Sequence, residues 1–371
     1  YLCSYCRLPD PLDPQVAGLS MKSQQESDGK ALLPPPQRRP VAHVLLFAAI
    51  VTVVIAACAI LFDALIDRSF VFHEHKTTDS VCTAPGCMPS WGIKQLATCG
   101  TRSWHETVVP LSLMVRLTYT ATQGSYYNAS EANATVAEWE RDLLRTADPP
   151  VGLRALLFVQ RATRRVVVAF RGTDLNRSCP SGAADACADA ILAAEPLPPS
   201  CSTFSNHTLD YIARALEFTS AAMRAYPGFA FLTAGHSLGG SLAMMAATSL
   251  GAPNVSLPAV GFSPGGWRSA LRRRTGLEPH PAAVAGRLYA LADAWDPVQG
   301  SADASGELMG EVCDWEVAPP PGCATCWATG APPPDWPADV ACAACFLSSH
   351  IYSNYVYTLV PGPRPTCSAT A

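Results

Sequence analysis

The hexapeptide Gly-His-Ser-Leu-Gly-Gly at residues 235–240 constrains the fold of this chain more than any other stretch. It fits the pattern Gly-x-Ser-x-Gly, in which a serine hydroxyl sits on a strained turn between a strand and a helix. Glycines flank the serine because the turn leaves no room for a Cβ there. The apolar run 229–234 has the length of a strand, and 241–247 is rich in helix formers. These flanks favour a strand–turn–helix unit carrying Ser237 over a chance match in a loop.

Strand and helix patterns alternate around this unit. Residues 153–160 and 165–170 are strand-like, and the polar residues between them predict a hairpin. We expect further strands over 257–262 and 286–292, and helices over 108–119, 131–145 and 208–226. Such alternation predicts an α/β fold of the α/β-hydrolase type, with a predominantly parallel sheet flanked by helices.

Chain order selects the partners that must activate the serine. A serine becomes a nucleophile when a histidine takes its proton and a carboxylate orients that histidine. In elbow hydrolases the order along the chain is Ser, then Asp or Glu, then His. Only His280 and His350 follow Ser237, and His280 precedes both aspartates that close a strand-like run, Asp293 and Asp296. We therefore predict His350 as the base and Asp296, which the next proline places in a turn, as the acid; Asp293 is the alternative.

Acyl transfer also needs hydrogen-bond donors for the oxyanion of the tetrahedral intermediate. The backbone N–H of the residue after the nucleophile, Leu238, is one expected donor. The second should come from a loop after an upstream strand. Thr173, just past the strand predicted over 165–170, could supply its backbone N–H and its hydroxyl.

Four motifs together resemble the class 3 lipases, the fungal-lipase-like α/β hydrolases, over about residues 106–360. They are Val167-Val-Ala-Phe-Arg-Gly-Thr173, Ala234-Gly-His-Ser-Leu-Gly-Gly240, Asp296-Pro-Val298 and the late His350. The resemblance implies that Ser237 is the nucleophile, that Asp296 and His350 complete the triad, and that Thr173 and Leu238 form the oxyanion hole. It further implies hydrolysis of carboxylic esters in acylglycerols or phospholipids without a cofactor.

The same resemblance assigns a lid to residues 174–200, where Cys179 and Cys187 could bracket 183–190. The chain departs from the family at two places. The usual His-x-Gly-Phe is replaced by Asn206-His-Thr-Leu-Asp210, and a Cys- and Pro-rich insert occupies 313–345.

Residues 41–62 form a run of 22 residues without Asp, Glu, Lys or Arg. As a helix the run would be roughly 33 Å long, enough to cross a bilayer, and it exceeds the roughly 7–15 residues of a signal-peptide core. Basic residues precede it and mostly acidic residues follow it, so we expect a type II orientation. The residues concerned are Lys22, Lys30, Arg38 and Arg39 before the run, and Asp63, Asp67, Glu74 and Asp79 after it.

The predicted organisation has four parts. Residues 1–40 form a disordered cytoplasmic tail, 41–62 a transmembrane signal anchor, 63–104 a cysteine-containing lumenal stalk, and 105–371 the hydrolase-like domain. Met21 offers an alternative start. The anchor and orientation are similar to those of membrane-anchored lipases of autophagic bodies, which implies a lumenal domain on the vacuolar or lysosomal route, or an extracellular one.

Cysteines and glycosylation signals agree with a lumenal domain. Of 15 cysteines, Cys3, Cys6 and Cys58 lie before or within the predicted span, which leaves 15 − 3 = 12, an even number suited to disulfides. Five Asn-x-Ser/Thr sequons follow the span, at Asn128, Asn133, Asn176, Asn206 and Asn254.

One cysteine cluster has two interpretations. Cys323-x-x-Cys326 and Cys342-x-x-Cys345 have the spacing of a zinc ribbon. Beyond a membrane span, and with further cysteines nearby, disulfides are the favoured interpretation.

The sequence leaves three function classes open. The favoured one is a lipid-directed serine ester hydrolase that needs no cofactor or metal and meets its substrate at a lipid surface. The alternatives are a non-catalytic lipid-binding glycoprotein with the same fold, and an acyltransferase using the same acyl-enzyme. A net charge of −4 gives no electrostatic case for nucleic-acid binding.

Overall fold

The computed structural model describes the chain from Thr101 onward, with gaps. Residues 120–135, 137, 146, 148, 150, 175–179, 252–256, 319–322, 324–325, 327–339 and 370–371 are not described. The predicted tail, the predicted span and residues 63–100 of the predicted stalk lie outside the described residues. Among the helices that are described, none has the length and apolar character needed to cross a membrane.

The described residues form one eight-stranded sheet in which the strands follow one another in chain order. The strands are β1 (Glu140–Arg141), β2 (Ala155–Gln160), β3 (Arg165–Phe170), β4 (Ala230–His236), β5 (Ala259–Phe262), β6 (Leu288–Asp293), β7 (Glu311–Trp315) and β8 (Thr366–Ala369). Strands β3 to β7 are parallel, while β1, β2 and β8 run antiparallel to their neighbours. The predicted predominantly parallel sheet is thus present, and so is the predicted β2–β3 hairpin.

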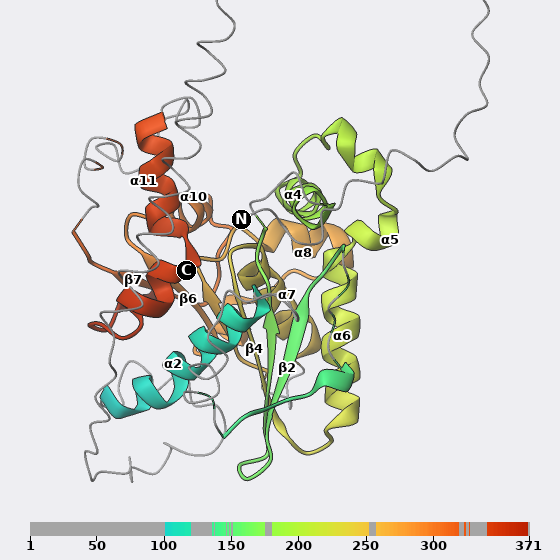
Figure 1. Cartoon of the computed structure of the whole chain (residues 1–371), viewed down its shortest axis with the longest axis vertical. Helices are drawn as coiled ribbons and strands as arrows, with labels where there is room; N and C mark the ends of the chain where they lie inside the picture. Colours follow the sequence, from blue (N-terminus) through green and yellow to red (C-terminus); the bar gives the residue numbers. More distant parts are fainter. Residues whose placement is uncertain are drawn as a thin grey trace, which may run out of the picture. The chain divides into compact units, whose positions relative to one another are not determined.

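Helices cover both faces of the sheet (Figure 1). The α-helices are α2 (Thr101–Thr118), α4 (Pro180–Ala193), α5 (Asn206–Leu209), α6 (Tyr211–Ala225), α7 (Leu238–Leu250), α8 (Arg268–Thr275), α9 (Pro281–Val284), α10 (Pro297–Ala304), α11 (Val340–His350) and α12 (Tyr352–Asn354). Two 3-10 turns, η2 (Leu143–Arg145) and η3 (Pro199–Thr203), and a π-helical turn, η4 (Tyr355–Leu359), complete the list.

The two cores follow from strand geometry. Along β3, Val166 and Val168 belong to the core beneath α6 and α7, whereas Val167 and Ala169 belong to the core shared with α2 and η4. Successive side chains of a strand point to opposite faces of the sheet. Because both faces are covered, β3 is an almost continuous apolar run rather than an alternating one.

The helix predicted over 131–145 is wrong in its described part. Strand β1 pairs Glu140 with Val159, and η2 follows it. The Asp142 carboxylate accepts hydrogen bonds from the backbone N–H groups of Leu144 and Arg145, which competes with a helix. Leu144 is 93% exposed, so its apolar side chain does not mark a buried helix face.

Several boundaries also differ from the prediction. The helix predicted over 208–226 is divided at Asp210, whose carboxylate caps α6 by accepting from the N–H of Ala213. Strands β7 and β8 were not predicted, and the first residues of the predicted insert belong to β7. A disulfide between Cys313 and Cys367 joins these two strands.

The other described disulfides settle the interpretation of the cysteine cluster. Cys323 pairs with Cys345 and Cys326 with Cys342, so all four cysteines of the zinc-ribbon pattern are in disulfides. The suggested bracket between Cys179 and Cys187 is wrong, because Cys187 pairs with Cys201 across a separation of 14 residues. Closing a loop of this size stabilises a fold by about 3 kcal/mol.

Of the five sequons, only Asn206 lies within the described residues. It is the first residue of α5 and is exposed. Asn128, Asn133, Asn176 and Asn254 lie outside the described residues, and glycosylation at all five stays a prediction.

Candidate active site

Ser237 occupies the turn between β4 and α7 with φ 54° and ψ −127°. A serine in this region of backbone space costs on the order of 1–3 kcal/mol, so the surrounding structure must hold it there. Its N–H donates to the carbonyl of Phe262, 2.9 Å away. A Cβ on Gly239 would come within 2.5 Å of the carbonyl oxygen of Phe170, and a Cβ on Gly235 would collide with the backbone of Gly239. The two glycines of the motif are therefore required by close backbone packing.

The structure brings Ser237, His350 and Asp296 together. The hydroxyl oxygen of Ser237 lies 3.0 Å from Nε2 of His350, at the end of α11. On the other side of the ring, Nδ1 of His350 lies 2.9 Å and 3.1 Å from the two carboxylate oxygens of Asp296. These distances form a continuous hydrogen-bonded chain from hydroxyl to imidazole to carboxylate.

Donors surround the buried carboxylate of Asp296, which is 2% exposed. It caps α10 by accepting from the N–H of Val298, at 3.0 Å. The Tyr355 hydroxyl donates to Oδ2 at 2.7 Å, and the Ser263 hydroxyl donates to the same oxygen at 2.5 Å. Burial alone would raise the pKa of Asp296, but the charge of His350 and the hydrogen bonds hold that pKa below its usual value. Asp296 is therefore suited to remain an anion beside the imidazole.

Sequence reasoning missed Ser263 and Tyr355. Ser263 has φ 46°, is fully buried, and its hydroxyl also lies 3.0 Å from Nδ1 of His350. Ser263 directly follows β5, at the carboxyl end of a parallel strand, which is where open α/β sheets bind their ligands. This position could have identified Ser263 as a candidate from the sequence. No local signal marks Tyr355, which reaches Asp296 from 59 residues away.

Asp293, the alternative acid, has other partners. Its carboxylate accepts from the N–H of Trp295 at 2.9 Å and from the side-chain amide of Asn354 at 3.0 Å. Burial raises the pKa of Asp293, whereas that of Asp296 is lowered. Within the part of the chain that the structure describes, Asp293 makes no hydrogen bond to His350.

His236 packs and hydrogen-bonds beside the three residues. Its Nε2 lies 2.9 Å from the carbonyl oxygen of His350, and its Nδ1 lies 2.7 Å from the Tyr119 hydroxyl. A carbonyl only accepts, so Nε2 carries the proton and Nδ1 accepts from Tyr119. The N–H of Gly172 in turn donates to the Tyr119 hydroxyl. Burial, followed by the charge of His350, lowers the pKa of His236 well below its usual value, so its ring is neutral.

The loop that follows β3 and carries Thr173, called the oxyanion loop below, lies against the turn at Ser237. A Cβ added to Gly172 would come within 3.2 Å of the Cβ of Ser237, which places this loop beside the nucleophile. The next residue, Thr173, donates its hydroxyl hydrogen to Asp189 of α4 at 2.7 Å. Its backbone N–H has no hydrogen-bond partner among the described residues, and the N–H of Leu238 is in the first turn of α7, where intrahelical acceptors are lacking. The two N–H groups predicted as oxyanion donors are thus not used by other hydrogen bonds among the described residues.

Helix α4 lies within the predicted lid segment and is tied to this loop. Arg171 forms an ion pair with Asp185 at 2.7 Å, and the Tyr211 hydroxyl donates to the same carboxylate at 2.6 Å. Together with the contact between Thr173 and Asp189, these bonds hold α4 against the oxyanion loop.

We expect Asp189→Ala to lower kcat for a soluble ester about tenfold, with KM within twofold, because residues that support a reacting group typically contribute about 10- to 100-fold. Steady-state kinetics measure the effect. Glu195→Ala removes an exposed carboxylate just after α4 and is the matched control. An unchanged kcat in Asp189→Ala would show that the contact with Thr173 does not position the oxyanion donors.

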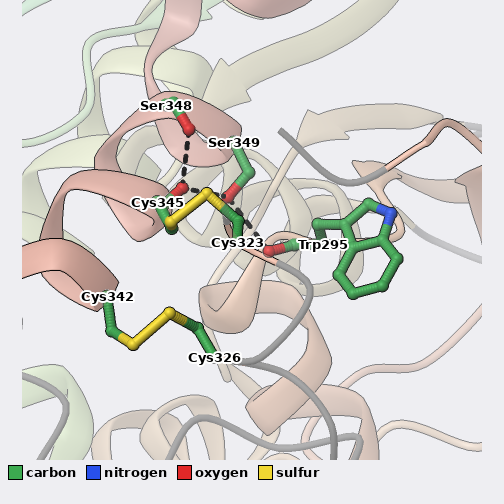
Figure 2. Close-up of a disulfide and its surroundings, with 7 residues drawn as sticks. All are labelled: Trp295, Cys323, Cys326, Cys342, Cys345, Ser348 and Ser349. Atoms are coloured by element: carbon green, nitrogen blue, oxygen red, sulfur yellow. Dashed lines mark hydrogen bonds between the residues drawn. A yellow bond between two sulfur atoms is a disulfide. The ribbon is translucent and has the colours of Figure 1, made fainter. Parts of the chain in front are cut away.

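Two disulfides clamp the helix that carries His350 (Figure 2). Cys342 and Cys345 lie one turn apart on α11 and are joined to Cys326 and Cys323. The Ser349 hydroxyl donates to the carbonyl of Trp295 at 3.0 Å, which connects α11 to the residue preceding Asp296 (Figure 2). The clamp therefore holds the helix of the predicted base against the loop of the predicted acid.

Proteins similar to this chain are found among solved structures. No family model matches the sequence, and no curated protein matches it. The Lip2 lipase from Yarrowia lipolytica is 15% identical, with 60% of this chain and 82% of that chain covered and a TM-score of 0.38. The lipase from Rhizopus microsporus var. chinensis is also 15% identical, with 66% and 84% covered and a TM-score of 0.39. Lipase II from Rhizopus niveus has 15% identity, 59% and 83% coverage and a TM-score of 0.36. Each of these three proteins is described as a lipase.

Proposed function

We propose that this protein is a serine hydrolase that cleaves carboxylic esters of lipids. The observation that carries the proposal is the chain of contacts from the Ser237 hydroxyl to His350 at 3.0 Å and from His350 to Asp296 at 2.9 Å. An imidazole in hydrogen-bond contact with a hydroxyl, and oriented by a buried carboxylate, is the arrangement that activates serine nucleophiles.

The reaction divides into two acyl transfers. His350 accepts the hydroxyl proton as Ser237 attacks the ester carbonyl, and the N–H groups of Leu238 and Thr173 stabilise the resulting oxyanion. His350 then gives the proton to the leaving alcohol, which leaves an acyl-enzyme on Ser237. Water, deprotonated by His350, attacks the acyl-enzyme and releases the carboxylic acid. Asp296 keeps the imidazole oriented and stabilises its charged form throughout.

A lipid substrate is supported by two features. The motifs around Thr173 and Ser237 resemble class 3 lipases, which act on acylglycerols or phospholipids. Ile351, the residue after His350, is 49% exposed. An apolar side chain this exposed, next to the proposed base in the chain, favours a lipid over a small polar ester.

An oxidising compartment is part of the proposal. Four disulfides among the described residues support a lumenal or extracellular location, since such bonds persist outside the reducing cytosol. Anchoring by residues 41–62 and the type II orientation rest on the sequence.

Covalent labelling with a serine-reactive fluorophosphonate tests whether the site is catalytic. We expect one label per chain on Ser237 in the wild-type protein and none in Ser237→Ala, because the reagent traps only an activated hydroxyl with an oxyanion hole. Mass spectrometry of the labelled peptide locates the adduct. Failure of the wild-type protein to react would favour the non-catalytic lipid-binding alternative, and product analysis with added alcohol would reveal an acyltransferase.

A further inference from the structure

A cavity lies beside α4, the helix that contacts the loop carrying Thr173. Its volume is about 300 Å³, and α4, the loop before η3, α5, the start of α6, and α8 line it. Figure 1 shows α4, α5 and α8 gathered around the upper end of α6. The size is at the lower end of the roughly 300–1,000 Å³ typical of small-molecule sites.

The cavity is distinct from the site at Ser237. None of the three triad residues lines it. Helix α4 contributes to both places, because Asp185 and Asp189 contact the loop that carries Arg171 and Thr173, while Ala188, Ile191 and Leu192 line the cavity.

The lining is mostly apolar. Aliphatic side chains from four elements contribute to it, including Leu192, Leu197, Leu209 and Ile212. Leu197 is 50% exposed, so the cavity continues into an apolar mouth at the surface. Covering such surface stabilises a bound hydrocarbon by about 25 cal/mol for each Å² removed from water.

One positive charge at this cavity lacks a counter-ion. Of the arginines of α8, Arg268 and Arg272 form ion pairs with Glu278, and Arg274 forms one with Asp210. Arg273 also lines the cavity, but its guanidinium contacts only the carbonyl of Leu192, at 2.6 Å. No carboxylate among the described residues pairs with Arg273. The residue lies in the last turn of α8, where a basic side chain interacts favourably with the helix dipole.

Asp210 does not cancel this charge. Its carboxylate lines the cavity, but Arg274 donates to both of its oxygens. Among the charged groups that line the cavity, the Arg273 guanidinium is therefore the one left to bind a ligand, and it matches the geometry of a carboxylate.

We propose that this cavity binds a free fatty acid, with the alkyl chain along the apolar lining and the carboxylate on Arg273. The proposal requires a single-chain anionic amphiphile, since the volume is small and the unpaired charge is positive. It stands whether or not Ser237 acts as a nucleophile, because none of the residues that carry it belongs to the triad.

The test is binding of dodecanoate, below its micelle concentration, to the Ser237→Ala protein by isothermal titration calorimetry. The protein is first treated with an endoglycosidase, because Asn206 lines the cavity and is a glycosylation candidate. Dodecyltrimethylammonium, with the same chain and a cationic head, is expected to bind at least tenfold more weakly than dodecanoate.

Two matched pairs of substitutions at exposed residues test whether dodecanoate binds in the cavity. Arg273→Glu and Leu197→Asp alter the cavity lining, whereas Arg272→Glu and Leu277→Asp make the same changes at exposed residues outside it. We expect the first two to weaken dodecanoate binding at least tenfold and the second two to leave it within twofold.

Several outcomes would overturn the proposal. One is no dodecanoate binding, and another is equal binding by all four variants, which would place the ligand elsewhere. Equal losses in Arg272→Glu and Arg273→Glu would indicate a diffuse surface charge rather than this cavity. Since every protein in the comparison carries Ser237→Ala, the result does not depend on the proposed hydrolysis.

Discussion

Ser237→Ala should lower kcat/KM for a soluble short-chain ester by at least about 10⁴-fold, because removing a triad nucleophile costs about 10⁶ in the best-studied cases. The variant keeps the elbow, the oxyanion N–H groups and the imidazole, and loses only the oxygen that attacks. Hydrolysis of a p-nitrophenyl ester by the purified protein measures the effect.

Ser249→Ala is the matched control for that experiment. Ser249 also lies on α7, and its hydroxyl has no hydrogen-bond partner among the residues that the structure describes. We expect this control to keep wild-type activity and the same thermal unfolding midpoint as Ser237→Ala. Retention of more than a tenth of the activity in Ser237→Ala would show that another group performs the attack.

The second large effect concerns the acid. Asp296→Asn is expected to reduce kcat about 10³- to 10⁴-fold, because an amide cannot hold the imidazole in the required tautomer or stabilise its charge. Asp293→Asn should reduce kcat less than tenfold, since an amide oxygen can still accept from the N–H of Trp295. Kinetics of the two variants, made in parallel on the same substrate, compare the aspartates directly.

The relative sizes of the losses in kcat of these two variants test the assignment of the acid. A larger loss in Asp293→Asn than in Asp296→Asn would reverse the assignment of the acid. The low pKa of Asp296 adds a condition, because its carboxylate should stay charged at neutral and mildly acidic pH. Protonation of Asp296 should therefore contribute nothing to a loss of activity between pH 8 and pH 5. The shape of the pH profile of kcat tests this expectation.

Local patterns predicted the elements that depend on neighbouring residues. The β2–β3 hairpin, the strand before Ser237 and the helix after it follow from apolar runs, turn residues and glycines within a few positions. Local patterns also predicted a helix up to Arg145, which is wrong. The Asp142 side chain accepts hydrogen bonds from the local N–H groups, and Glu140 pairs with strand β2 instead.

The sequence alone determined which serine could be a nucleophile and limited its base to His350, because motif spacing and chain order are one-dimensional properties. Only the tertiary structure placed Asp296, rather than Asp293, against His350. It also supplied Ser263 and Tyr355, paired Cys323 with Cys345, and brought Asp189 to Thr173. The physical reason is that a buried donor or acceptor takes its partner from whatever the packed chain brings within about 3 Å, irrespective of sequence separation.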